Sequence, residues 1–138
     1  MTFTHATPTT TSGRKVNIAL WALQVLLAAA FLLAACTKFI AYPDAVEAFD
    51  QIGLGVWFMY FIGAVELSGA VGLLVPALSG LAGLGLTALL AGAVVTQILL
   101  FDPVTVITPA AYLVPVTLVA WGRRQHTVKL LRRSNREA

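Results

Sequence analysis

Charged residues are scarce in this chain. Lys, Arg, Asp and Glu together make up 11% of the 138 residues, whereas hydrophobic residues make up 59%. Soluble domains usually carry about 25% charged residues, and a surface with so little charge would not keep a water-soluble globule monomeric. The composition therefore excludes an ordinary soluble domain. It indicates a single domain that lies largely within a lipid bilayer.

Cysteine and histidine are almost as rare. The single cysteine, Cys36, excludes an intrachain disulfide and a metal cluster held by cysteines alone. His5 and His126 lie in the hydrophilic ends of the chain, so we expect no buried histidine set that could hold haem or zinc. The sequence predicts no metal site.

The positions of the basic residues are more informative than the net charge of +3. Eight of the nine Lys and Arg residues flank the apolar part of the chain: Arg14, Lys15, Arg123, Arg124, Lys129, Arg132, Arg133 and Arg136. Such flanks are typical of the signals that orient membrane helices. The C-terminal flank lacks the interleaved aromatic residues of a nucleic-acid-binding surface. We therefore expect a lipid bilayer as partner and no nucleic acid.

Four apolar segments predict an all-α fold, an integral membrane bundle of four transmembrane helices. They cover about residues 16–41, 56–76, 81–101 and 104–121. A helix needs about 20 residues to cross a hydrocarbon core of about 30 Å, so the fourth segment is short. Pro109 and Pro115 are expected to bend this fourth helix or to interrupt its hydrogen bonds.

A short amphipathic helix is expected between the first two spans, over about residues 43–53. Ala45, Phe49 and Ile52 recur there at helical spacing, opposite the acidic residues Asp44 and Glu47. A helix with this pattern typically lies on the membrane surface.

The two ends of the chain are polar. Residues 1–15 are predicted to form a disordered tail, because they bury too little apolar surface to offset the entropy of ordering. Residues 123–138 form a basic tail. With four spans both tails lie on one side of the membrane, and their Lys and Arg residues predict that this side is the cytoplasm. The amphipathic segment then lies on the outer side.

The first span also resembles a bacterial lipoprotein signal, in which Leu33–Cys36 would be the cleavage box. Cleavage would leave lipids on Cys36 as the anchor. However, the apolar run continues past the cysteine, and Lys38 stands where a polar linker would begin, which favours an intact span. Cys36 lies about 200° around the helix from Lys38. We therefore expect a packed, inert thiol rather than one activated by the lysine.

Glu66 lies near the middle of the second span. A carboxylate at the centre of a bilayer is costly unless it is paired, hydrated or protonated, so it must face the interior of the bundle. Gly63, Gly69 and Ala70 share its helix face and would let another helix approach closely. Two interpretations stay open: a carboxylate that binds a ligand or handles a proton, and one that only holds helices together.

Lys38 is the natural partner of Glu66, because it is the only basic residue away from the two basic flanks. It stands about one turn inside the outer end of the first span, and its long stem allows a direct or water-bridged pair. The alternative is that Lys38 extends to the outer membrane interface. The sequence does not decide between the two.

Gln97, Trp57 and Tyr60 complete the set of candidate binding residues. A glutamine in a span commonly forms hydrogen bonds between helices, and Trp and Tyr commonly anchor a helix at the membrane interface. Even so, Lys38, Glu66 and Gln97 would all point into the outer half of one bundle. The two aromatic residues could line a cavity there.

These features resemble the DoxX-like family of small four-helix bacterial membrane proteins, over about Val16–Gly122. The motifs that carry the likeness are Cys36-Thr37-Lys38-Phe39, Phe49…Gly53, Glu66-Leu67-Ser68-Gly69-Ala70 and Leu73-Leu74. The resemblance implies a multi-pass protein of the bacterial cytoplasmic (inner) membrane. Family members often carry a histidine late in the third span, where this chain has Gln97, so a role that needs an imidazole is in doubt here. The family takes its name from a membrane subunit linked to thiosulfate oxidation with quinone as acceptor, and some distant relatives act as membrane assembly factors.

Three functions are consistent with the residues and the resemblance. The first is an accessory membrane protein that binds quinone or another small apolar molecule as a subunit of a redox assembly. The second is a stand-alone thiosulfate- or thiol-linked quinone oxidoreductase. Because the sequence has no catalytic motif and firmly implies no cofactor, a non-catalytic role is favoured over an enzyme. The third is a membrane assembly or chaperone-like protein that docks the helices of a membrane protein partner or of a second copy in a homo-oligomer.

Overall fold

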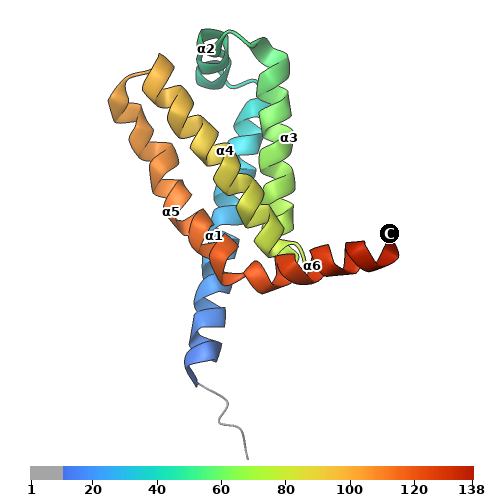
Figure 1. Ribbon diagram of the computed structural model, residues 1–138. Helices are drawn as coiled ribbons and strands as arrows, with labels where there is room; N and C mark the ends of the chain where they lie inside the picture. The colour runs from blue at the N-terminus through green and yellow to red at the C-terminus, as the bar shows by residue number, and fades with distance from the viewer. Residues whose placement is uncertain (1–10) are drawn as a thin grey trace, which may run out of the picture.

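The computed structural model describes residues 11–138, and the described chain is helical almost throughout (Figure 1). Its elements in order are α1 (Thr11–Phe39), α2 (Pro43–Ile52), α3 (Gly55–Leu74), α4 (Ser79–Leu100), the 3-10 helix η1 (Pro103–Val106), α5 (Ile107–Gly122) and α6 (Arg124–Glu137). Within residues 11–138 there is no strand.

Four stretches of the described chain are long and apolar enough to cross a membrane: Gly13–Phe39, Gly55–Leu74, Ser79–Leu100 and Pro103–Gly122. This confirms the predicted all-α membrane fold with four spanning helices. Much of the bundle's outer surface is apolar; Leu26 and Leu99, for example, are exposed. Such a surface is costly in water and suited to acyl chains, so the chain is a multi-pass membrane protein.

Helix α1 begins earlier than the composition indicated. It starts at Thr11, so residues 11–15 are helical although they belong to the predicted disordered tail. The backbone of a spanning helix is fully hydrogen-bonded, and Arg14 and Lys15 are good helix formers that let the helix continue beyond the apolar run. Residues 1–10, the rest of that predicted tail, lie outside the described residues.

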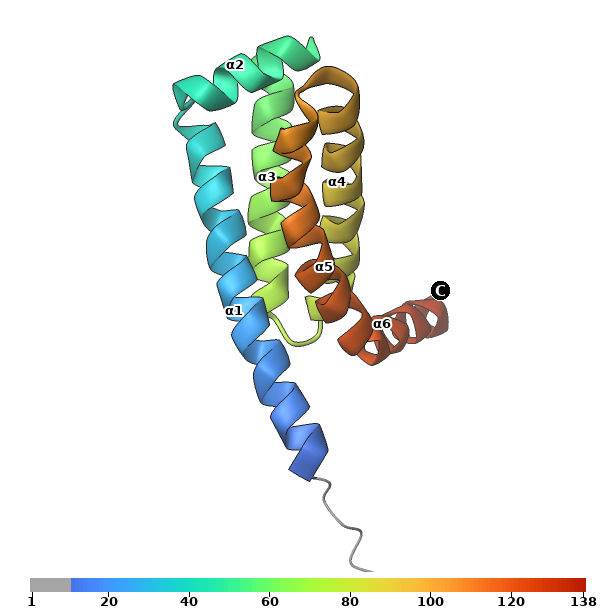
Figure 2. The ribbon, with the colours of Figure 1, turned by 90° about the vertical axis from the view of Figure 1, so that its left-hand side faces the viewer.

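The four spanning helices pack as two antiparallel pairs, one on each side of the bundle. Helix α1 packs along α3, and α4 packs along α5 (Figure 2). Helices α3 and α4 are joined by the short turn 75–78. The short helix α2 crosses one end of the bundle, here called the α2 end, and α6 leaves the opposite end, the α6 end (Figures 1 and 2).

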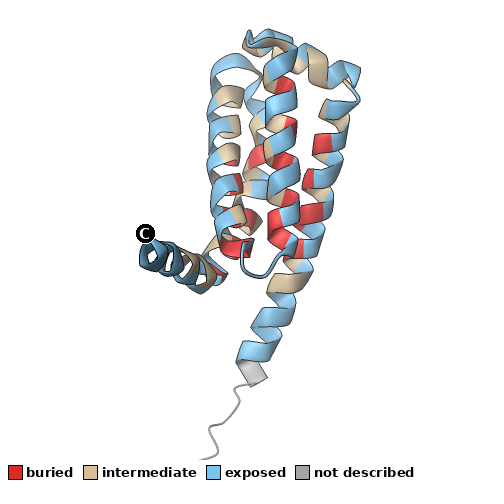
Figure 3. Cartoon of the chain, turned by 90° about the vertical axis from the view of Figure 1, so that its right-hand side faces the viewer, coloured by how far each residue is buried: buried red, intermediate tan, exposed pale blue. Residues whose placement is uncertain are grey.

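The core lies where α1, α3, α4 and α5 face one another. Its buried members are Leu27, Ala28, Phe31, Ala70, Leu73, Leu86, Leu90, Val116 and Val119. Buried residues are denser in the half of the bundle nearer the α6 end (Figure 3). The half nearer the α2 end is therefore the less closely packed one.

The two prolines of the fourth span do not end its helix. Pro109 is the third residue of α5, where its missing N–H would have no partner within the helix. Pro115 lies inside α5, and the helix continues to Gly122. Its missing N–H leaves the carbonyl of Ala111 without its usual donor four residues on.

Glycine allows the closest approach between α4 and the start of α6. A Cβ at Gly80 would lie 2.6 Å from the carbonyl oxygen of Arg123, a backbone atom that cannot easily move away. At Gly85, five residues on in the same helix, an added Cβ would meet no atom within 4 Å. Gly80 and Gly85 therefore form a matched pair of positions at which the effect of an added methyl group can be compared.

We predict that Gly80→Ala destabilises the protein by about 1–3 kcal/mol, because the added methyl group overlaps the backbone at the α5–α6 junction. Gly85→Ala should leave the stability unchanged or raise it by up to about 1 kcal/mol, since alanine is the better helix former. Thermal unfolding of both variants in the same detergent tests this. Equal stability of the two variants would contradict the packing described here.

Candidate functional site

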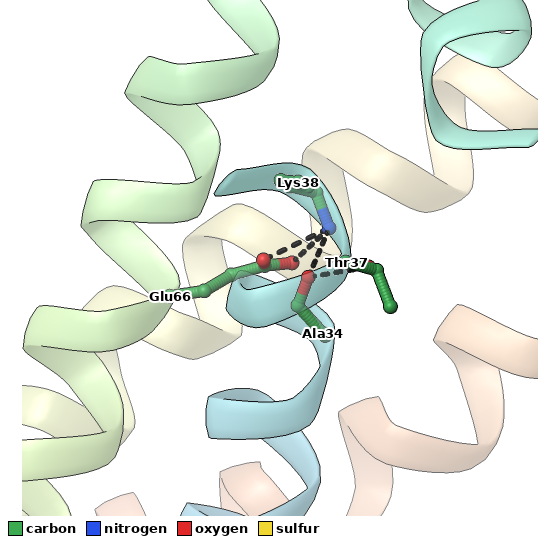
Figure 4. A network of polar contacts seen from close by, with 4 residues as sticks. All are labelled: Ala34, Thr37, Lys38 and Glu66. Atoms are coloured by element: carbon green, nitrogen blue, oxygen red, sulfur yellow. Dashed lines mark hydrogen bonds and ion pairs between the residues drawn. The ribbon is translucent and has the colours of Figure 1, made fainter. Parts of the chain in front are cut away.

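Lys38 and Glu66 form an ion pair inside the bundle (Figure 4). The Nζ atom of Lys38, in the last turn of α1, donates a hydrogen bond of 3.0 Å to Oε1 of Glu66, in the middle of α3. The same Nζ lies 2.9 Å from Oε2 and 3.3 Å from the carbonyl oxygen of Ala34. The two side chains are only 14% and 11% exposed. Of the two arrangements left open by the sequence, the structure has the direct pair.

The pair depends on a close contact between α1 and α3. A Cβ at Gly63, one turn before Glu66, would lie 3.2 Å from Cβ of Lys38 and 3.5 Å from the ring of Phe39. Real Cβ atoms are rarely packed so tightly, so the glycine brings the two helices together at this level. The small residue on the Glu66 face thus contributes to the pair, in line with the small-residue packing of membrane helices.

Both oxygens of Glu66 lie within 3.0 Å of the Lys38 ammonium group, but only Oε1 accepts a well-aligned hydrogen bond from it. Oε2 is buried and accepts no well-aligned hydrogen bond from any residue between 11 and 138, although the charge of Lys38 is close by. The ammonium group, 2.9 Å away, compensates the charge of this oxygen.

The larger of two cavities at this site has a volume of about 490 Å³. Besides the ion pair, it is lined mostly by apolar side chains of α2, α3 and α4. Ala48, Phe49 and Ile52, the apolar face of α2, lie on its wall. The helix predicted to rest on the membrane surface thus covers the cavity at the α2 end.

A second cavity of about 460 Å³ is also lined by Lys38 and Glu66. Its other walls come from α1, η1, α4 and α5, and include Phe31, Thr108 and Tyr112. Five residues line both cavities: Lys38, Glu66, Leu90, Ala93 and Gln97. The ion pair therefore faces about as much open space as a drug-sized ligand pocket provides.

Gln97 combines the two roles considered for it. Its Oε1 lies 2.7 Å from Oγ1 of Thr105, so it accepts a hydrogen bond that ties α4 to η1. It also lines both cavities, together with Lys38 and Glu66. These three candidate residues are brought together as expected.

Trp57 and Tyr60 do not belong to this group. Neither residue lines a cavity that contains the ion pair, and their exposed fractions are 66% and 39%. The ring of Tyr60 stacks on Phe39 instead. The suggestion that they could wall the site is therefore wrong, because the sequence pattern did not fix which face of α3 they occupy. Both suit the interface role that Trp and Tyr commonly have in membranes.

The expectation of a packed cysteine is also wrong. Cys36 is exposed on the outside of α1 and lines neither cavity. It sits on a different face from Lys38, as the helical spacing required.

A second polar cluster at the α6 end was not predicted. Gln24, fully buried in α1, donates a 2.6 Å hydrogen bond from Nε2 to the carbonyl oxygen of Leu73. Its Oε1 accepts a 2.8 Å hydrogen bond from Nε of Arg123, and Nη1 of Arg123 donates to Oδ1 of Asn17 at 2.8 Å. A glutamine in the middle of an apolar span was the available signal. The sequence contained no signal for the role of Arg123, because this residue resembled the other basic residues of its flank.

No metal site is evident in the part of the chain that the structure describes. No three His, Cys, Asp or Glu side chains lie close enough together there to hold a metal ion. The chemistry available beside the cavities is that of one carboxylate, one ammonium group, one amide and a few hydroxyl groups. Such a set binds and orients a molecule through hydrogen bonds and charge.

The fold and site define a small multi-pass membrane protein with a buried ion pair between apolar cavities. The chain belongs to the DoxX-like family, which matches residues 22–119. The family resemblance of the sequence is thereby confirmed. No curated protein and no solved structure matches the chain.

We predict strong coupling between Lys38 and Glu66. Lys38→Met leaves a buried carboxylate unpaired, and breaking a buried pair in this way typically costs about 3–5 kcal/mol. The double variant Lys38→Met/Glu66→Gln removes both charges and should be more stable than Lys38→Met alone. A double-mutant cycle, with unfolding followed in mixed micelles, measures the coupling. Additive effects of the two substitutions would contradict a direct pair.

Proposed function

We propose that this DoxX-like protein is a non-catalytic membrane subunit that binds a quinone or another small, largely apolar molecule beside Lys38 and Glu66. The observation that carries the proposal is that the buried ion pair of Lys38 and Glu66 lines two cavities of ligand size.

The size and lining of the cavities support a small apolar ligand. Volumes of about 490 and 460 Å³ fall within the range of ligand pockets. Phe31, Phe49 and Leu90 offer apolar surface for a ring or a chain. Ligand pockets typically combine such surface with a few polar groups that fix the orientation.

The ion pair offers both kinds of hydrogen-bonding group to a quinone. The Lys38 ammonium can donate to a carbonyl oxygen of the oxidised form. The Glu66 carboxylate can accept from a hydroxyl group of the reduced form. Charged partners give the stronger hydrogen bonds, particularly in an apolar surrounding. Gln97 adds a further polar group on the wall of both cavities.

The stand-alone oxidoreductase is the less favoured alternative. A thiol-linked reaction would need a thiol near the substrate, and Cys36 lies outside both cavities. In the favoured, non-catalytic role, this protein supplies the binding site, and a partner in the redox assembly carries out the chemistry.

A helix-docking role has one observation in its favour. A shallow groove of about 270 Å³ runs between α3 and α4, with Ser68, Gly69, Gly72, Ala82 and Gly85 among its lining residues. Small residues of this kind let membrane helices approach closely. An assembly or chaperone-like function would use this face, and it is compatible with ligand binding at the ion pair.

For localisation we propose the bacterial cytoplasmic membrane, with the α6 end of the bundle in the cytoplasm. The support is the distribution of charge: Arg14, Lys15 and the basic residues of α6 flank the bundle at this end. Glu47, Asp50 and Asp102 lie in α2 and in the α4–η1 link, at the other end. The positive-inside rule then assigns the sides.

We predict that Glu66→Gln weakens binding of a short-chain ubiquinol by at least about ten-fold, the usual worth of a hydrogen bond to a charged group. Ala93→Leu should weaken binding of both the quinone and the quinol, because Ala93 lines both cavities and the larger side chain fills them. Isothermal titration calorimetry of the full chain in detergent micelles measures the affinities.

Tyr60→Phe is the matched control, because it removes a polar group that lies outside both cavities. Its affinities should equal those of the unmodified protein. A folded Glu66→Gln variant that binds the quinol as tightly as the unmodified protein would remove the proposal.

The orientation predicts the behaviour of fusion proteins. Green fluorescent protein fused after Ala138 should fluoresce, and alkaline phosphatase at the same place should be inactive, since only the first of these folds in the cytoplasm. Alkaline phosphatase inserted next to Asp102, in the link between α4 and η1, should be active. The opposite pattern of activities would reverse the assigned sides.

A further inference from the structure

Helix α6 extends sideways from the bundle instead of continuing the direction of α5. In Figures 1 and 2 it runs across the lower end of the bundle, at a large angle to the spanning helices. It begins at Arg124, and the single residue Arg123 separates it from the end of α5 at Gly122. A helix in this position lies along the membrane surface when the spans cross the bilayer.

Contacts at the start of α6 fix its direction. The His126 ring donates a hydrogen bond from Nδ1 to the carbonyl oxygen of Pro76, in the α3–α4 turn. Thr127 packs against Gly80 of α4. Arg123 is 9% exposed and is held by Gln24 and Asn17. The helix is therefore docked on the bundle at its first turn rather than joined to it by a free linker.

The charge of α6 is strongly positive. Between Arg124 and Glu137 the helix carries five basic residues and one acidic residue. The basic residues are Arg124, Lys129, Arg132, Arg133 and Arg136, and all are exposed. The single acid, Glu137, lies 3.7 Å from Arg133 in a fully open ion pair, which screens little of this charge.

Apolar side chains of α6 lie exposed beside these charges. Val128 and Leu131 are 47% and 62% exposed, although they are one turn apart on one side of the helix. Trp121, at the end of α5, is 67% exposed, and the guanidinium of Arg124 lies 4.8 Å from the centre of its ring. An exposed Trp beside an Arg at the end of a span is typical of the membrane interface.

We propose that α6 is an interfacial helix that binds the anionic phospholipids of the leaflet at its end of the bundle. The Lys and Arg side chains contact the phosphate groups, and Val128 and Leu131 enter the boundary between headgroups and acyl chains. A basic amphipathic helix at the surface binds in this way. The spanning helices hold the docked helix α6 at the level of the headgroups of this leaflet. We therefore take this leaflet to be the binding partner of α6.

This role goes beyond orienting the spans. Orientation requires only basic residues near the ends of the spans, and it is satisfied by a disordered basic tail. It does not account for a docked helix with exposed apolar residues on one side. The proposal is also independent of ligand binding at Glu66, which lies toward the other end of the bundle.

Depth measurements on spin-labelled protein test the position of α6. In a Cys36→Ser background, the variants Leu131→Cys and Arg133→Cys are labelled and reconstituted in vesicles containing one-third phosphatidylglycerol. The label at 131 should be accessible to oxygen and protected from a water-soluble nickel complex, and the label at 133 should show the reverse. Equal exposure of both labels to the nickel complex would overturn the proposal, since α6 would then face water, where a nucleic acid or an acidic protein would be its partner.

Lipid preference is tested by native mass spectrometry of the full chain in detergent. Phosphatidylglycerol should be retained more strongly than phosphatidylcholine with the same acyl chains. Arg124→Gln/Arg132→Gln should reduce this preference by roughly five- to thirty-fold, at about a five-fold effect per basic residue.

Arg14→Gln/Lys15→Gln is the matched control. It removes the same amount of charge from the start of α1, whose first turns extend past α6 in Figure 2. This variant should keep most of the preference. Equal losses in the two double variants would overturn a specific role of α6 and leave a general effect of net charge.

Discussion

The ion pair between Lys38 and Glu66 is the interaction on which the α2 half of this bundle depends. A lone carboxylate at this depth would be costly in an apolar medium, and so would a lone ammonium group. The two groups therefore require each other, and with them a close contact of α1 and α3 at Gly63. The pair holds these helices together on one side while leaving space on the other. Structural and binding roles are in this way two consequences of one contact.

The membrane fold could be predicted from the sequence because it depends on few choices. A bilayer requires about 20 apolar residues for each helical span, and four such stretches are unmistakable. The family motifs around Lys38 and Glu66 indicated the same fold, and the chain belongs to the DoxX-like family. The helix at residues 43–52 also follows from simple periodicity, because its acidic and apolar residues alternate at helical spacing.

The details of the site could not be predicted in the same way. Whether Lys38 reaches Glu66 depends on how closely two helices approach, which a single sequence does not state. Which face of α3 carries Trp57 and Tyr60 depends on the rotation of that helix, and aromatic residues suit an interface and a cavity equally well. Arg123 was hidden among similar residues of the basic flank, although it is buried with Gln24. Its role is a matter of packing between distant segments.

The two ends of the bundle use buried polar groups in opposite ways. At the α6 end, Gln24 and Arg123 form a hydrogen-bonded network that joins α1, α3 and the α5–α6 junction. At the α2 end, Lys38 and Glu66 pair with each other and line two cavities. Each end has a buried polar atom without a hydrogen bond from the described residues, Oε2 of Glu66 and Nη2 of Arg123, so hydrogen bonding alone does not distinguish the two ends. Because the ion pair borders two cavities of ligand size and the Gln24–Arg123 network borders neither of them, ligand binding is best sought beside Glu66.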